Sequence, residues 1–103
     1  MAIPYDIGGF GDRSAFIIDI SVSFRRILAA LRKAPKFAII EKRIWVITDD
    51  YYCRFSVMGY ELEIITPLGD YFIEPANPGH PMEPFQAIKR ALDTKEPWWR
   101  HLP

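Results

Sequence analysis

An early segment of the chain repeats apolar residues at the spacing of one helix face. The residues at i, i+3, i+4 and i+7 are Phe24, Ile27, Leu28 and Leu31. This spacing places apolar side chains in a stripe along an α-helix. Ser21 or Ser23 can cap the first turn with its hydroxyl. Pro35 ends the pattern, because the residue before a proline is disfavoured in helical conformation. The segment predicts an amphipathic helix of about three turns.

The following segment, residues 37–74, has the composition and alternation of β-structure. β-branched and aromatic residues are concentrated in residues 44–48 and 51–57, which favours strands. In residues 61–64 glutamates alternate with apolar residues, as in a strand with one face in water. Short turn signals separate these strands, so we expect hairpins and an antiparallel sheet.

Two further elements lie outside this segment. Residues 14–20 contain three isoleucines and a phenylalanine. They predict a strand, although seven residues do not separate strand from helix by periodicity. Residues 84–93 predict a second amphipathic helix, with Phe85, Ile88 and Leu92 on one face.

These elements predict an α+β fold, in which a single antiparallel sheet of three to five strands carries two amphipathic helices on one face. We expect residues 1–103 to form a single globular domain. Three segments without periodic pattern are expected to be irregular, namely a Gly-rich N-terminal loop at 1–13, a Pro-rich loop at 75–84 and an aromatic C-terminal tail at 96–103.

The composition fits this interpretation. The chain has 103 residues, of which 50% are hydrophobic, and its formal net charge is zero. Intrinsically disordered chains and uniformly basic nucleic-acid binders have different compositions, so both classes are disfavoured. A single cysteine excludes an intramolecular disulfide and fits a reducing compartment. No apolar run approaches the length of about 20 residues that crosses a membrane. We therefore expect a soluble, cytoplasmic protein with no membrane contact.

No residue pattern in the chain assembles a catalytic or metal site. The cluster Gly8-Gly9-Phe10-Gly11 lacks the preceding strand and the lysine of a phosphate-binding loop. His80 has Glu74 and Glu83 near it in sequence, but no second histidine or cysteine. Cys53 lies in an expected strand and is interpreted as a core residue, with Arg54 on the opposite face. We predict no catalytic residue, no metal and no cofactor.

Charge and tryptophan supply the candidate binding residues. The face of the first helix opposite its apolar stripe carries Arg25, Arg26, Arg32 and Lys33. Lys36, Lys42 and Arg43 extend this basic run. Residues 1–43 hold eight basic and four acidic residues, whereas residues 44–103 hold five and nine. The neutral chain is thus polarised, which can steer an encounter with a partner. Trp98 and Trp99 in the tail are of a residue type enriched at binding hot spots.

We therefore expect a small non-catalytic protein that acts through protein–protein interaction, as an adaptor, inhibitor, chaperone or immunity-type factor does. Its partner would be another protein, or a second copy of the chain in a homodimer. Two alternatives stay open. One is a nucleic-acid-binding regulator that uses the basic face of the first helix, and the other is a small enzyme or ligand-binding domain with a pocket beside the sheet.

Overall fold

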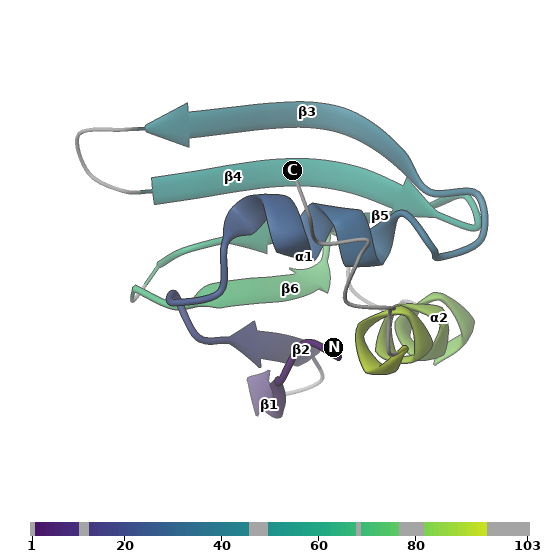
Figure 1. Cartoon of the computed structure of the whole chain (residues 1–103). Coiled ribbons are helices and arrows are strands. Elements are labelled where there is room, and N and C mark those ends of the chain that lie inside the picture. The colour runs from purple at the N-terminus through teal and green to yellow at the C-terminus, as the bar shows by residue number, and fades with distance from the viewer. Residues whose placement is uncertain (1, 11–12, 46–49, 68, 77–81, 95–103) are drawn as a thin grey trace.

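A computed structural model describes residues 2–10, 13–45, 50–67, 69–76 and 82–94 of the chain. Its elements, in chain order, are β1 (Asp6–Phe10), β2 (Arg13–Ile18), α1 (Phe24–Leu31), β3 (Ala38–Trp45), β4 (Asp50–Val57), β5 (Tyr60–Ile65), β6 (Tyr71–Pro75) and α2 (Met82–Asp93). All six strands belong to one antiparallel sheet in the order β1–β2–β6–β5–β4–β3 (Figure 1).

The α+β class, the antiparallel sheet and the two helices are confirmed, but the expected number of three to five strands is wrong. The additional pairing comes from the segment that was expected to be a Gly-rich loop, since residues 6–10 form β1 against β2. Glycine weakens an isolated strand, yet here it provides room. A Cβ added to Gly8 would lie only 2.8 Å from Cδ1 of Ile17. Pairing with β2 therefore outweighs the low strand propensity of the segment.

The first helix forms as its pattern predicts. The Ser23 hydroxyl accepts a hydrogen bond from the backbone N–H of Arg26 at 3.2 Å and caps the helix. Phe24, Ile27, Leu28 and Leu31 are all buried. The expected strand in residues 14–20 is also confirmed, as β2. The turn between β4 and β5 has positive φ at Met58 (56°) and at Gly59 (85°), the backbone of a tight two-residue hairpin.

Both helices pack on the same face of the sheet. On α1, Phe24 stacks on Tyr51 of β4 with ring centroids 4.9 Å apart. On α2, Phe85 stacks on Phe16 of β2 with centroids 4.2 Å apart. The buried side chains of β2, β4, β5 and β6 join both helices in one apolar cluster. The opposite face of the sheet is left without a helix among the described elements (Figure 1). Within the described residues, no helix is long and apolar enough to cross a membrane.

Candidate binding groove

A groove of about 580 Å³ lies between α1 and the edge strand β3. Three of its lining residues are cationic: Arg25, Arg32 and Lys42. Its apolar lining comes from Phe24, Leu28, Ala29 and Ile44, and its hydroxyl groups from Ser23 and Tyr51. Among the residues that the structure describes, no aspartate or glutamate lines the groove. The arrangement is suited to an anionic group attached to an apolar one.

The register of the sheet explains how Lys42 reaches this groove. Lys42 pairs with Cys53, and Ile44 pairs with Tyr51, so both side chains point to the face of the sheet that carries the helices. Strand β3 lies at the sheet edge. Its lysine is therefore exposed beside α1 instead of being buried beneath it. In the part of the chain that the structure describes, no ion pair joins Arg25, Arg32 or Lys42 to a carboxylate.

The structure separates the four basic residues that the sequence grouped on the first helix. Arg25 and Arg32, seven residues apart, line the groove. Arg26 points elsewhere, and its Nη2 donates to the carbonyl oxygen of Ala2 at 3.5 Å. Lys33 is exposed but is not part of the groove lining. The three cations of the groove are thus Arg25 and Arg32 from the first helix and its C-cap, and Lys42 from β3.

Strand β3 lies at the edge of the sheet, and the register shows which of its backbone groups point away from β4. The N–H of Tyr51 donates to Oγ1 of Thr66 at 3.1 Å, so it points from β4 toward the β5 side. The N–H and C=O groups of successive residues in a strand point to alternate sides, so those of Tyr52 and Arg54 point toward β3. Arg43 is paired with Tyr52, so its backbone N–H and C=O groups point inward to β4. Its neighbours Lys42 and Ile44 direct their N–H and C=O outward.

A second contact agrees with this assignment. The N–H of Met58 donates to the carbonyl of Pro35 at 3.1 Å, on the β3 side. Met58 lies six residues beyond Tyr52, an even number, so its N–H is expected to point to the same side as that of Tyr52. No strand among the described residues pairs with the outer edge of β3. The outward backbone groups of Lys42 and Ile44 thus lie at the rim of the groove without a strand partner in the described part of the chain.

Strand β3 also exposes apolar side chains. Ile39, Ile40 and Ile44 are 37%, 43% and 48% exposed. Three partly exposed isoleucines on one edge strand are unusual, because a long apolar edge invites pairing with another chain. A bulge between Ile39 and Glu41 interrupts the register at the start of the strand. From Glu41 to Trp45 the pairing with β4 is regular.

Glutamates flank Arg54 on the sheet face away from the helices. The register places Arg54 of β4 between Glu41 of β3 and Glu63 of β5, with Glu74 of β6 next in the row. Nε of Arg54 is buried and has no hydrogen-bond partner among the residues that the structure describes. Glu41 also pairs with Arg43 of its own strand. The carboxylates thus gather on the face opposite the groove.

The other candidate residues do not form a reactive site among the described residues. Cys53 is fully buried, as expected for a core cysteine, and burial raises the pKa of its thiol to about 11. A protonated buried thiol is a poor nucleophile. No group of three or more metal-ligating side chains occurs in the described ranges. His80, His101, Trp98 and Trp99 lie outside the described residues, so the prediction for the tryptophans stays a prediction.

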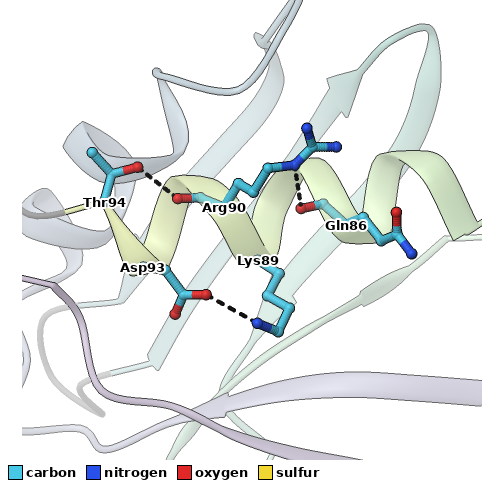
Figure 2. A network of polar contacts seen from close by, with 5 residues as sticks. All are labelled: Gln86, Lys89, Arg90, Asp93 and Thr94. Atoms are coloured by element: carbon cyan, nitrogen blue, oxygen red, sulfur yellow. Dashed lines mark hydrogen bonds and ion pairs between the residues drawn. The ribbon is translucent and has the colours of Figure 1, made fainter.

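Polar contacts along α2 are local (Figure 2). Nζ of Lys89 lies 3.1 Å from Oδ2 of Asp93, and Oγ1 of Thr94 donates to the carbonyl of Arg90 at 2.7 Å. The hydrogen bonds from Lys89 and Tyr5 lower the pKa of the Asp93 carboxyl. The N–H of Ile3 donates to the carbonyl of Leu92 at 3.0 Å. The contacts of Ile3 and Tyr5 hold the N-terminal segment against the end of α2, and neither residue is in the described lining of the groove.

Ile44 and Tyr51 line the groove, although no pattern in the sequence indicated them as binding residues. Ile44 begins the apolar run Ile44–Ile47, which is typical of a buried strand. Only the strand order shows that it lies at an edge. Comparison of the chain with protein-family models, with curated proteins and with solved structures finds no match.

Proposed function

We propose that this is a small non-catalytic protein that acts through protein–protein contact, and that the groove between α1 and β3 holds an acidic, partly apolar segment of another protein. The cytoplasm is the compartment we propose, because the single, buried cysteine fits reducing conditions.

One observation supports this function above the others. Arg25, Arg32 and Lys42 converge on a groove whose lining is apolar and, within the described ranges, contains no carboxylate. Cations without a nearby counter-charge favour an anionic partner and speed its association. The apolar lining favours side chains over bare phosphates, since burial of apolar area stabilises a complex. An acidic protein segment supplies both kinds of group.

Nucleic acid is less well matched to this surface. Its affinity comes mainly from many phosphate contacts, and neither Arg26 nor Lys33 belongs to the described lining of the groove. The opposite face of the sheet adds repulsive carboxylates, among them Glu63 and Glu74. The groove has the volume of a small-ligand pocket, but a small ligand would leave Ile39 and Ile40 uncovered on β3. A protein segment can cover both.

A charge-reversal experiment with a matched control tests this function. The groove variant is Arg25→Glu with Arg32→Glu, and the control is Arg26→Glu with Lys33→Glu, which makes the same change in net charge on the same helix. The probes are a fluorescein-labelled 20-residue peptide of random Glu, Leu and Val order and a labelled 20-nucleotide DNA strand, titrated by anisotropy at fixed salt.

We expect the groove variant to bind the peptide at least tenfold more weakly than the natural chain does, and the control variant to stay within threefold. The full chain should prefer the peptide to the DNA. Equal losses in both variants would show that the interaction is non-specific, and tighter DNA binding would favour the nucleic-acid alternative. Either result would contradict the proposed function.

A further inference from the structure

We infer that the acidic segment binds as an added antiparallel strand on the outer edge of β3, with every second side chain, a carboxylate, turned into the groove. This inference rests on the proposed function and assigns it a binding mode. Strand addition obtains affinity from main-chain hydrogen bonds and specificity from pockets that read alternate side chains.

The backbone of β3 is arranged for this mode. Lys42 and Ile44 direct their N–H and C=O groups outward, as the contact between Tyr51 and Thr66 shows. An antiparallel strand would form hydrogen-bonded pairs with these two residues. Side chains opposite each other in such a pair lie on the same face. The residues that bond to Lys42 and Ile44 are therefore the ones whose side chains enter the groove.

The dimensions of the groove agree with alternate carboxylates. An added strand lies about 4.8 Å beyond β3, and its groove-side residues repeat every ~6.8 Å. Arg25 and Arg32 both line the groove and are separated by about 10.5 Å of helix rise. Two or three successive groove-side carboxylates span this interval. Long arginine side chains can adjust to the remaining difference.

Charge distinguishes an acidic partner from a second copy of the chain. Two β3 edges paired around a two-fold axis normal to the sheet would place both sets of helices on the same face. Arg25, Arg32 and Lys42 of both copies would then gather along one seam. Like charges brought together oppose such an association. An acidic strand neutralises the same cations.

Backbone methylation of a peptide probe tests the mode directly. The probe is a fluorescein-labelled eight-residue peptide of alternating Glu and Val. One derivative is N-methylated on its glutamates and the other on its valines. If carboxylates enter the groove from an antiparallel strand, the glutamate N–H groups face β3. Methylated glutamates should then weaken binding at least tenfold, whereas methylated valines should leave it within twofold.

A substitution in β3 tests the same contact from the side of the protein. Ile44→Pro removes one outward N–H, and Ile44→Val keeps that N–H while shortening the side chain. We expect the proline variant to bind the unmethylated peptide at least tenfold more weakly than the valine variant does. Circular dichroism and thermal unfolding of both variants establish that each is folded before binding is compared.

The outcomes separate this inference from the proposed function. If charge reversal of Arg25 and Arg32 abolishes peptide binding but neither methylation nor Ile44→Pro affects it, the groove binds a protein segment in another mode and the inference is overturned. Sensitivity to valine methylation in place of glutamate methylation overturns it as well. A dimer that forms with rising concentration and is lost in Ile44→Pro would identify a second copy as the occupant, which also overturns it.

Discussion

Proline substitution at two adjacent residues of β3 should have very different costs. The N–H of Arg43 points inward to β4, and that of Ile44 points outward. Proline has no N–H and is tolerated in sheets only where that group faces solvent. Arg43→Pro should therefore damage the sheet, and Ile44→Pro should not.

The magnitudes follow from the contacts that each proline removes. Arg43→Pro breaks one ladder hydrogen bond, at about 0.5–1.5 kcal/mol, and leaves the half-buried Tyr52 carbonyl unpaired, at a further ~1–3 kcal/mol. Ile44→Pro loses a solvated N–H and part of a side chain that is 48% exposed. Full burial of such a side chain contributes about 1.5–3 kcal/mol. The cost of Ile44→Pro is therefore at most about 1 kcal/mol. Proline also lowers the conformational entropy of the unfolded chain, which offsets part of this cost.

Urea unfolding followed by circular dichroism measures both variants against the natural chain. We predict that Arg43→Pro lowers the free energy of unfolding by about 2–4 kcal/mol and Ile44→Pro by no more than ~1 kcal/mol. Arg43→Ala, which keeps the N–H, separates the backbone effect from loss of the side chain. Equal costs, or a larger cost at Ile44, would refute the assigned direction of the β3 edge and the inference built on it.

Further predictions concern the core, the turn, the thiol and the tail. Phe16→Ala removes a fully buried ring packed on Phe85 and should lower the free energy of unfolding by about 3–5 kcal/mol in urea titrations. Gly59→Ala adds a Cβ at a φ of 85° and should cost roughly 1–2 kcal/mol in the same assay. The Cys53 thiol should resist thiol reagents at pH 8 in the folded chain and react in urea. Its pKa is about 11 when folded and about 8.5 when unfolded. The unfolded state therefore releases its proton first, and the free energy of unfolding should fall between those pH values. Cys53→Ala should weaken that fall. Removal of residues 97–103, with Trp98 and Trp99, should reduce capture of a partner from the native host while leaving thermal unfolding unchanged. Undiminished capture would remove the tryptophans from the interface.

The elements that the sequence predicted well are those with strong local signals. Helix α1 has a complete apolar stripe, a serine cap at Ser23 and a following proline, all of which act within the segment itself. Strand β1 has no such signal. Gly8 and Gly9 disfavour a strand locally, and the strand exists because β2 pairs with it. Tertiary pairing of this kind is not visible in the local pattern.

The candidate site was only partly predictable for a related reason. Arg25 and Arg26 are adjacent in sequence, but neighbours on a helix differ by about 100° in direction. Which of them faces β3 depends on how the helix is set on the sheet. The role of Lys42 depends on strand order, because the same residue in a central strand would lie in the core. The sequence indicated a larger set of basic residues, and the fold places three of them, Arg25, Arg32 and Lys42, at the groove.

Amide hydrogen exchange of β3, measured with and without the alternating Glu–Val peptide, shows whether the peptide adds a strand to this edge. In the free protein the Arg43 amide should exchange slowly, and the Lys42 and Ile44 amides should exchange fast, because their N–H groups face solvent. With saturating peptide, the Lys42 and Ile44 amides should become protected while that of Arg43 stays as it was. Unchanged exchange at Lys42 and Ile44 in a saturated complex would contradict the account.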